Sequence, residues 1–352
     1  MSYSNPQLLS KVYHFLPHLE ALLGVYNLLL GESRRASTDL FFSRSRVNEW
    51  QQSFRHLFET YGAVKELTGA FVLECLLDFD TVDFSLEEFE AYLLGLPEEE
   101  RLWSLAPWSH LAEATKEDLK AALVDEKILD DLYGKVQNYC SSYLGFVAFI
   151  RESDRYLKEY LDLAKLILSD GLETRLAQNK QKAQVFQEKV NSRLEKLDPL
   201  SLSEELMGKQ FRNRGPYEMT YFIPSLLLPS RCLRLFDEDE TNGAKQFVFC
   251  RLENAEKNPE NTVAVVKAFA DETRYRILML LSQSGPMKGQ EIVKALKLAP
   301  STISHHMTAL SENGLVVEEP VKTAKYYSLS KKNLDQLLKT IVEDLDLKTF
   351  EE

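Results

Sequence analysis

The spacing of apolar residues predicts that the chain is helical up to about residue 200. Large apolar side chains recur there at three- and four-residue steps, with few of the alternations that strands show. PHLEALLGVYNLLLG is predicted to be a helix that stops at Gly31. FSLEEFEAYLLGLPEEE is predicted to begin with a capping box, because Glu88 follows Ser85 by three residues, and to end near Gly95.

Residues 153–196 form one long amphipathic segment within this helical part. Leu157, Leu161 and Ala164 fall on one face, and Gly171 is expected to interrupt the helix. Such a helix either packs within its own chain or pairs with a second subunit, and the pattern leaves both alternatives open.

The pattern changes from helical to strand-like after Pro199. YEMTYFIP and RCLRLF alternate between apolar and polar residues, and KQFVFCRL is rich in residues that favour strands. Between the last two lies DEDETNGA, in which Asn242-Gly243 is a turn signal. We therefore expect a small hairpin or sheet in this region.

A polar stretch, ENAEKNPEN, marks the clearest domain boundary. It contains no large apolar residue, and Asn258-Pro259 is typical of a helix N-cap followed by proline at the first helical position. The predicted fold class is mainly α with small β. It comprises a helical N-terminal domain at 1–200, for sensing or dimerisation, a small strand-rich region packed on it at 201–255, and a compact C-terminal domain at 258–345.

The stretch APSTISHHMTALSENGLV in the C-terminal domain predicts an amphipathic helix with an unusually polar outer face. On a helical wheel Ile303, Met307 and Leu310 form one apolar stripe. The helix is expected to end at Asn313-Gly314. Polar residues lie opposite the stripe or on its flank: Ser301, Ser304, His305, Thr308 and Glu312.

The flanking segments predict that this helix is part of a winged helix-turn-helix. EIVKALKLAP supplies a short preceding helix, with Ile292 and Leu296 facing inward and a tight turn after it. LVVEEPVKTAKYYSLS predicts two strands around a turn, which is the wing. The alternative, an amphipathic helix with a merely solvated face, does not account for this order of elements.

The polar outer face suits double-stranded DNA. Serine and threonine hydroxyls bind phosphates or base edges, and residues in the first helical turn bring backbone N–H groups close to a phosphate. A histidine one turn further along can donate to a phosphate or to a guanine acceptor. The candidate DNA-binding residues on this helix are Ser301, Thr302, Ser304, His305 and Thr308.

The segments FADETRYRIL, STISHHMTAL, NGLV and KYYSL resemble the winged helix of the ArsR family of bacterial transcriptional regulators. They occur in the family's order and spacing, over roughly residues 260–345. The resemblance implies a homodimeric, operator-binding protein, usually a repressor, whose recognition helix is Ser301 to Asn313. It also implies a wing at about Val317–Leu329, where Lys322 and Lys325 reach the DNA backbone. The long N-terminal part is similar in layout to a subset of the family that carries such a domain.

The charge of the chain is distributed unevenly between its two parts. The first 261 residues hold 30 Lys and Arg against 42 Asp and Glu, whereas residues 262–345 hold 11 against 9. The total of -12 argues against a protein dedicated to coating nucleic acid. We therefore expect the acidic N-terminal part to stay off DNA, and the weakly basic winged helix to depend on dimerisation for affinity.

Residues that would support other chemistry are sparse, so no cofactor and no metal is predicted. The four cysteines are widely spread and form no CxxC pair. The cysteine pair of the family's metal sensors is missing from SGPMKGQEIV, and adjacent His305 and His306 point about 100° apart and chelate poorly. His306 borders the apolar stripe and is predicted to be a packing residue.

Two other classes of function remain as alternatives: an enzyme, or a protein-interaction scaffold, with an appended winged helix. GxSxG, HExxH, GxGxxG and P-loop patterns are missing, so we predict no catalytic residue and no enzyme. The N-terminus lacks a signal-peptide pattern and the apolar runs are too short to span a bilayer. A cytoplasmic protein without a membrane partner is expected.

The N-terminal part holds two features that suit an effector, either a small molecule or a protein. One is a basic cluster that suits DNA or an anionic ligand, although a solvated loop is the simpler explanation. The other is an abundance of aromatic residues, since only 5 of the 37 Phe, Tyr and Trp lie after residue 261, and these form either a ligand pocket or a plain core. The basic cluster consists of Arg34, Arg35, Arg44 and Arg46.

Overall fold

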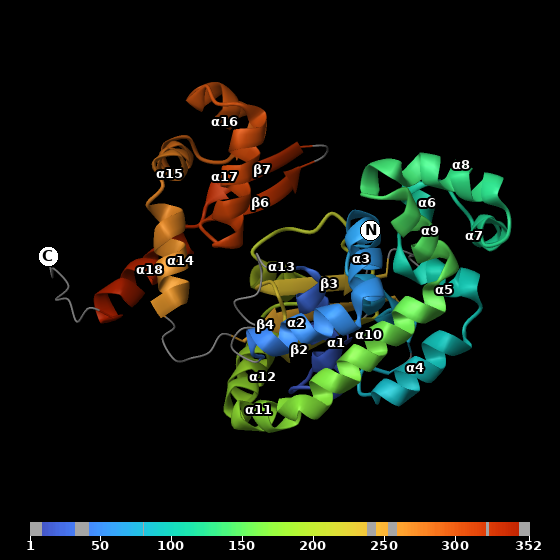
Figure 1. The fold of residues 1–352 in the computed structure, drawn as a ribbon. Coiled ribbons are helices and arrows are strands. Elements are labelled where there is room, and N and C mark those ends of the chain that lie inside the picture. The colour runs from blue at the N-terminus through green and yellow to red at the C-terminus, as the bar shows by residue number, and fades with distance from the viewer. Residues whose placement is uncertain are drawn as a thin grey trace, which may run out of the picture. The chain divides into compact units, whose positions relative to one another are not determined.

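The computed structural model describes residues 9–31, 42–79, 81–237, 244–252, 259–321 and 324–344 (Figure 1). The chain divides into two compact units. The N-terminal unit comprises Met1–Pro199 with Gly215–Leu252, and the C-terminal unit comprises Leu200–Arg214 with Glu253–Glu352. Some predicted features lie outside the described residues: Arg34, Arg35, the Asn242-Gly243 turn and the Asn258 N-cap.

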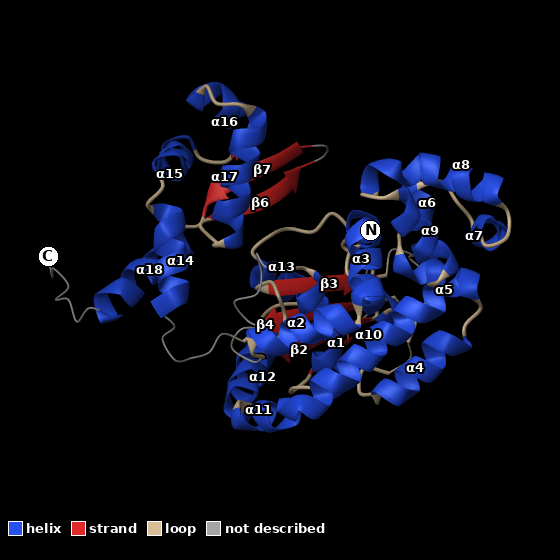
Figure 2. Cartoon of the chain, in the orientation of Figure 1, coloured by secondary structure: helices blue, strands red, loops and turns tan. Residues whose placement is uncertain are grey.

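The N-terminal unit is predominantly helical, as predicted, and strands account for only a small part of it (Figure 2). Its helices are α1 (Pro17–Leu29), α2 (Arg44–Ser53), α3 (Arg55–Thr68), the 3-10 helix η2 (Phe71–Leu76), α4 (Leu86–Gly95), α5 (Glu98–Leu105), α6 (Trp108–Leu111), α7 (Lys116–Ala122), α8 (Glu126–Val136), the 3-10 helix η3 (Gln137–Tyr139), α9 (Tyr143–Arg151), α10 (Ser153–Ile167), the π-helical turn η4 (Leu168–Leu172), α11 (Glu173–Gln178) and α12 (Lys180–Leu194).

Local signals placed several of these helix ends correctly. The capping box of α4 is present, with the Glu88 N–H 3.1 Å from Ser85 Oγ and the Ser85 N–H 2.7 Å from Glu88 Oε2. Gly31 follows α1 with a φ of 80°. Gly171, with a φ of 81°, interrupts the predicted long helix after α10. Positive φ is strained for a residue with a Cβ, so glycine suits both positions.

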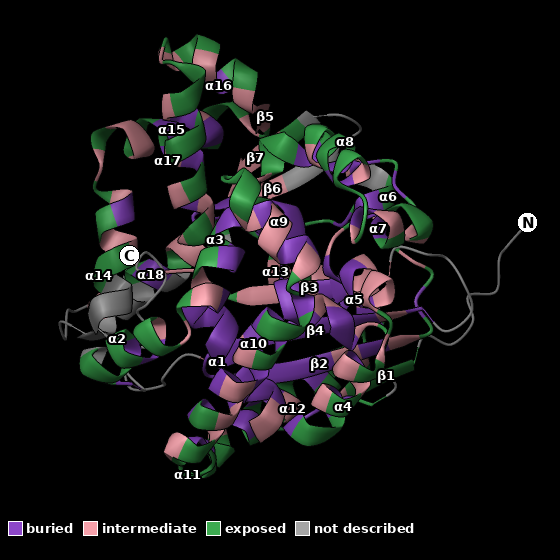
Figure 3. Ribbon diagram, turned by 45° about the vertical axis from the view of Figure 1, so that its right-hand side comes forward, coloured by how far each residue is buried: buried purple, intermediate pink, exposed green. Residues whose placement is uncertain are grey.

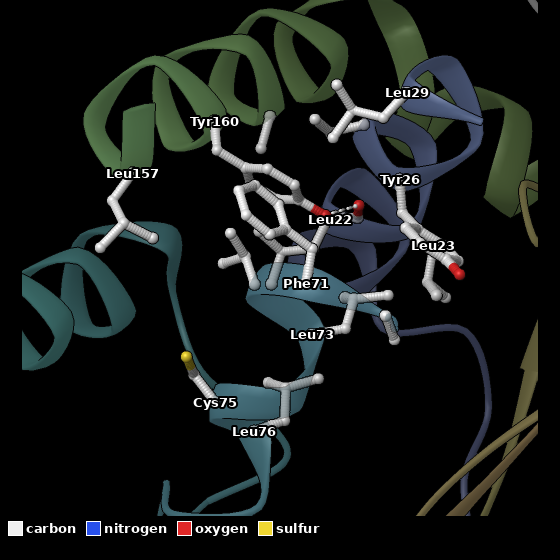
Figure 4. Close-up of a cluster of buried hydrophobic side chains, with 14 of the residues drawn as sticks. Leu22, Leu23, Tyr26, Leu29, Phe71, Leu73, Cys75, Leu76, Leu157 and Tyr160 are labelled. Carbon is white, nitrogen blue, oxygen red and sulfur yellow. Dashed lines mark hydrogen bonds between the residues drawn. The ribbon is translucent and has the colours of Figure 1, made fainter. Parts of the chain in front are cut away.

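Helix α10 lies at the centre of the N-terminal unit, because it packs against α1, α3, α4 and α9. Leu157, Leu161 and Ala164 are fully buried, so this part of the amphipathic segment packs within its own chain. Tyr160 is buried as well, and its hydroxyl donates to the Leu22 carbonyl of α1 at 2.8 Å (Figure 4). That hydrogen bond satisfies the one polar atom of a side chain that otherwise contributes apolar area.

The strands of the N-terminal unit form one mixed sheet in the order β1-β2-β4-β3. Strands β1 and β2 are parallel, as are β2 and β4, whereas β3 and β4 are antiparallel. Figure 3 shows buried residues, in purple, along β2. The strands are β1 (Leu9–Val12), β2 (Met219–Ser225), β3 (Cys232–Phe236) and β4 (Lys245–Arg251).

Strand β1 corrects the prediction that the chain is helical throughout its first 200 residues. It pairs with β2 in a parallel register in which Leu9 lies opposite Met219. The sheet is therefore more than a local hairpin of the strand-rich region. The four residues of β1 carry no alternation long enough to detect, and their pairing partner lies far away in the sequence.

A buried carboxyl group ties α1 to the segment that follows β2. Glu20 is 2% exposed, and its Oε1 accepts the N–H groups of Leu226 at 2.6 Å and Leu227 at 2.5 Å. Asn27, two turns further along α1, donates to the Leu227 carbonyl at 2.7 Å. Burial raises the pKa of Glu20 to about 7, although the hydrogen bonds from Leu227, Ser225 and Leu226 oppose that shift.

The C-terminal unit has the order of elements of a winged helix. Its three-stranded sheet runs β5-β7-β6, and its apolar core joins all its elements from α14 to β6 around Ile277 and Leu310. The elements are α13 (Pro199–Met207), α14 (Pro259–Phe269), α15 (Glu272–Ser284), β5 (Met287–Lys288), α16 (Gly289–Leu296), α17 (Pro300–Glu312), β6 (Val316–Val321), β7 (Ala324–Leu329) and α18 (Lys331–Asp344).

The segment DETR joins α14 to α15 by hydrogen bonds at both helix ends. Asp271 is the N-cap of α15, and its Oδ1 accepts the Arg274 N–H at 2.9 Å. The Arg274 guanidinium turns back to the end of α14, where it donates to the carbonyls of Ala268 at 2.7 Å and Lys267 at 3.0 Å. These carbonyls have no partner within α14, so the arginine satisfies them.

We expect Glu20→Gln to remove a pH dependence of stability. The folded state holds the Glu20 proton up to about pH 7, whereas the unfolded chain releases it near 4.5. Stability should therefore fall as the pH rises from about 4.5 to about 7, and stay low above pH 7. At about 1.4 kcal/mol per pKa unit, the loss amounts to a few kcal/mol. Glutamine keeps the accepting oxygen without a charge, so the variant should be the more stable protein at pH 8.

This difference is measured by urea unfolding at pH 5 and pH 8, followed by tryptophan fluorescence. All three tryptophans lie in the N-terminal unit. Exposed Glu49→Gln is the control and should change little at either pH. An equal effect of Glu20→Gln at the two pH values would contradict the assignment.

We expect Asp271→Ala to destabilise α15 by about 1 kcal/mol, because the helix loses its N-cap. Asp271→Asn should cost less, since asparagine also caps helices well. The bond from the Arg274 N–H lowers the pKa of Asp271, so the stabilisation is present at neutral pH and is lost on acidification through that pKa. Hydrogen exchange of the α15 amides measures the effect. Equal losses of α15 stability in Asp271→Ala and Asp271→Asn would show that N-capping by Asp271 is not the source of that stability.

Candidate nucleic-acid interface

Helices α16 and α17 form the predicted helix-turn-helix. Helix α16 ends at Leu296, and Lys297 adopts a left-handed conformation with a φ of 55°. After Ala299 the chain enters α17 with Pro300 in the first turn, where the missing N–H is tolerated. Ile292 is fully buried and Leu296 packs against the same core, as predicted.

The inner side of α17 carries the predicted apolar stripe. Ile303 and Met307 are each 2% exposed, and Leu310 is fully buried. Together they join the core formed with α15 and α16. This contact sets the rotation of α17 about its axis and therefore decides which residues face solvent.

The outer side of α17 carries most of the polar residues expected to meet DNA. Ser301, Ser304, His305 and Thr308 are exposed. Thr302 is half-buried, so it lies nearer the flank than the centre of this face. We call the exposed set, with the first turn of the helix, the α17 outer face.

Hydrogen bonds within α17 decide which groups on the outer face are available. The Thr308 hydroxyl donates to the Ser304 carbonyl at 3.0 Å, so Thr308 offers its remaining lone pairs mainly as acceptors. Ala299, the N-cap, supplies no side-chain acceptor. The first-turn N–H groups of Ser301 and Thr302 therefore have no intrahelical partner and remain open to an anion.

The two adjacent histidines have different environments. His305 is exposed, whereas the side chain of His306 is 14% exposed and packs inward, as predicted. His306 Nδ1 lies 3.7 Å from Asp271 Oδ1, next to the N-cap of α15. The sequence alone did not predict this contact between α17 and α15. It also did not predict the hydrogen bonds from Arg274 to the end of α14, because both depend on how the helices pack. No group of three or more metal-binding side chains occurs among the described residues.

The wing consists of β6 and β7, which pair in the register Val316↔Leu329 to Val321↔Ala324. Lys325 is exposed, but its Nζ lies 3.2 Å from a carboxylate oxygen of Glu318. The one predicted wing lysine within the described chain is thus already paired with an acidic residue. Lys322, the other, lies outside the described residues.

Comparisons with known proteins match this part of the chain. A family model described as "Bacterial regulatory protein, arsR family" matches residues 271–317. An uncharacterized HTH-type transcriptional regulator of Methanocaldococcus jannaschii is 33% identical over 84 residues, which are 24% of this chain and 94% of that protein. The cadmium resistance transcriptional regulatory protein CadC homolog of Staphylococcus aureus is 30% identical over 101 residues, 29% of this chain and 78% of that protein.

A further relative has a solved structure. The transcriptional activator HlyU of Vibrio cholerae is 30% identical over 90 residues, 26% of this chain and 82% of that protein. Its structure covers 25% of this chain and 95% of its own, with 28% identity and a TM-score of 0.22.

The site and the comparisons agree on the class of protein. The relatives named above are transcriptional regulators by their descriptions, and the family model begins at Asp271 and ends within β6. No described helix is both long enough and apolar enough to cross a membrane. The chain therefore belongs to the ArsR family of bacterial regulatory proteins and carries the DNA-binding domain of a transcriptional regulator.

Proposed function

We propose that this chain is a transcriptional repressor that binds a partly palindromic operator as a homodimer. In this proposal the N-terminal unit senses an effector, contributes to dimerisation, or does both. The observation that carries the proposal is the α17 outer face, a row of hydroxyl and imidazole groups held outward by a buried apolar stripe. The proposed DNA contacts are Ser301, Thr302, Ser304, His305, Thr308, Lys322 and Lys325.

The α17 outer face offers two kinds of contact. Its first turn presents the open N–H groups of Ser301 and Thr302 with the Ser301 hydroxyl, a combination that suits a phosphate. One turn later, His305 projects from the exposed side, where an imidazole in the major groove can donate to a guanine acceptor. The first contact positions the helix and the second supplies sequence preference.

Several exposed apolar side chains in the C-terminal unit support a homodimer. Val263 on α14 is 46% exposed, Tyr275 and Met279 on α15 are 46% and 45%, and Leu338 on α18 is 58%. Helices α14 and α18 contact each other, so residues from both ends of the unit lie near one surface. A second copy would cover apolar area there and place two recognition helices about one DNA turn apart.

Dimerisation also supplies affinity that charge alone does not provide. The winged-helix residues 262–345 carry a balance of only +2. Each phosphate neutralised by a protein releases counterions, so a weakly basic module gains little from this effect by itself. Two modules acting together on one operator compensate for that deficit.

The N-terminal unit is proposed to act through a partner other than DNA. Its acidic excess repels phosphates, and the Arg46 side chain of the basic cluster is paired with Asp170 at 2.9 Å. Trp50 and Trp108 are 4% and 1% exposed, so they form core rather than an open aromatic surface. An effector of this unit, a small molecule or a protein, would therefore not compete directly with the operator.

We expect His305→Ala or Ser301→Ala to weaken operator binding by about 1–3 kcal/mol if each residue makes a good base contact. Fluorescence anisotropy with DNA from upstream of the chain's own coding sequence measures this, against a scrambled duplex. Gln283→Ala, exposed on α15, is the control and should bind as the unmodified protein does. Unchanged affinity in both α17 variants would mean that another face meets DNA.

In cells, His305→Ala should raise transcription from the operator's promoter, because a repressor that binds less tightly blocks the promoter less. A fall in transcription would make the protein an activator.

We expect Glu318→Gln to strengthen DNA binding, because it frees Lys325 from its ion pair and removes a negative charge from the wing. Exposed ion pairs contribute about 0–1 kcal/mol, so a gain of a few fold is expected. The salt dependence of binding should become steeper. Lys325→Gln is the opposite control and should not strengthen binding. A gain of equal size in Lys325→Gln would refute a contact between Lys325 and DNA.

A further inference from the structure

Two cysteines that are distant in the sequence meet in the sheet of the N-terminal unit. Cys232 begins β3, Cys250 lies near the end of β4, and the register places them directly opposite each other. Their Sγ atoms are 3.7 Å apart, within hydrogen-bonding distance for sulfur. Both are thiols in this structure.

The hydrogen bonds of the β3–β4 ladder show that the pair occupies a position suited to a disulfide. The Arg251 N–H donates to the Arg231 carbonyl at 2.9 Å, and the Asp237 N–H donates to the Lys245 carbonyl at 3.0 Å. Because hydrogen-bonded and non-hydrogen-bonded pairs alternate, Cys232 and Cys250 form a non-hydrogen-bonded pair. Such pairs have Cα atoms about 4.5 Å apart, inside the range that disulfides span.

The two thiols differ in exposure. Cys232 is half-buried, whereas Cys250 is 6% exposed. The hydrogen bond with Cys232 and burial raise the pKa of Cys250 well above its ordinary value. Cys250 therefore keeps its proton. Because Cys232 is the more exposed sulfur, a peroxide reaches it first.

The other two cysteines lack this arrangement. Cys75 is 2% exposed and burial raises its pKa. Cys140 is half-buried, and burial raises its pKa to about 11. In the described part of the chain, neither has another sulfur within hydrogen-bonding distance. Cys140 is therefore a matched control, a partly accessible thiol without a partner.

We propose that Cys232 and Cys250 form a reversible disulfide on exposure to a peroxide, and that this oxidation is a signal through which the N-terminal unit changes operator binding. The second half of the proposal rests on the function proposed above. The first half concerns a chemical modification of this sheet and does not depend on DNA.

The reaction with hydrogen peroxide balances in two steps. The Cys232 thiolate attacks one peroxide oxygen and breaks the O–O bond, which yields a sulfenic acid and, after protonation of the leaving hydroxide, one water. The Cys250 thiol then attacks the sulfenic sulfur, and the S–O bond breaks to release a second water. Two thiols thus lose two electrons and two protons, and one peroxide is reduced to two waters.

The pair lies close, along the chain, to the point where the N-terminal unit ends. Strand β4 is the last strand before the chain leaves the N-terminal unit at Leu252, and the Leu252 N–H is bonded to the Ser225 carbonyl at 2.7 Å. A disulfide would fasten edge strand β3 to β4 two residues before that exit. The half-buried position of Cys232 leaves the bond partly accessible to a reducing thiol, which suits a reversible signal.

The first test locates the bond in the full-length protein. Protein treated with hydrogen peroxide is blocked with a thiol-alkylating reagent, digested without reductant and analysed by mass spectrometry. We expect a linked peptide pair that contains Cys232 and Cys250, lacks two hydrogens and separates with dithiothreitol. Cys140→Ser should give the same pair, and Cys250→Ser should leave a sulfenic acid on Cys232. Oxidation without this linkage, or only to sulfinic acid, would overturn the proposal.

The second test measures the signal by operator anisotropy on reduced and oxidised protein. We expect oxidation to change the operator Kd by about fivefold or more in the unmodified protein and in Cys140→Ser, and not in Cys250→Ser or Cys232→Ser. A linked pair with unchanged Kd would overturn the signalling role. Failure of the reduced protein to bind any upstream DNA would count against the proposed function, whereas peptide mapping would still decide the disulfide.

Discussion

The functional surface of this protein depends on the burial of three side chains in α17. Ile303, Met307 and Leu310 each remove most of their surface from water, and a buried side chain of this size contributes about 1.5–3 kcal/mol. The outer face adds little helix stability, because serine, threonine and histidine are mediocre helix formers. The helix therefore exists, and presents hydroxyls and an imidazole outward, because its inner stripe is held in the core. A rotation of one residue, about 100°, would turn the polar face away from the groove.

The neighbouring elements keep that stripe in place with few polar contacts. Asp271 caps α15 and Arg274 closes the end of α14, so the two helices meet at a defined angle under α17. His306 lies against Asp271 and belongs to this support rather than to the outer face. The wing adds little positive charge because Lys325 is paired with Glu318. In the proposed dimer–operator complex, recognition thus depends on geometry and on a second copy more than on bulk electrostatics.

The N-terminal unit is held together by contacts between residues that are far apart in the sequence. Tyr160 binds the backbone of α1, and Glu20 binds the segment after β2. The sheet combines a strand from the start of the chain with three strands from beyond residue 218. Cys250, which pairs with Cys232, lies two residues before the chain leaves the N-terminal unit at Leu252. In the redox proposal a change there acts on β4, whose residues 246–250 are all buried.

The sequence by itself determined the features that depend on neighbouring residues. The capping box at Ser85, the break at Gly171, the stripe of α17 and the turn before it were all predictable, because caps and periodicity are local. The winged helix was recognisable for the same reason, since its segments follow one another closely.

Only the tertiary structure decided which distant groups meet. Strand β1 was missed because four residues are too few to show an alternation, and a parallel partner some two hundred residues away leaves no local signal. The cysteines looked unrelated until the register of β3 and β4 set them opposite each other. The buried carboxyl of Glu20 and the pairing of Lys325 likewise depend on packing. Local chemistry specifies the elements, whereas their contacts are set by the free energy of burying them together.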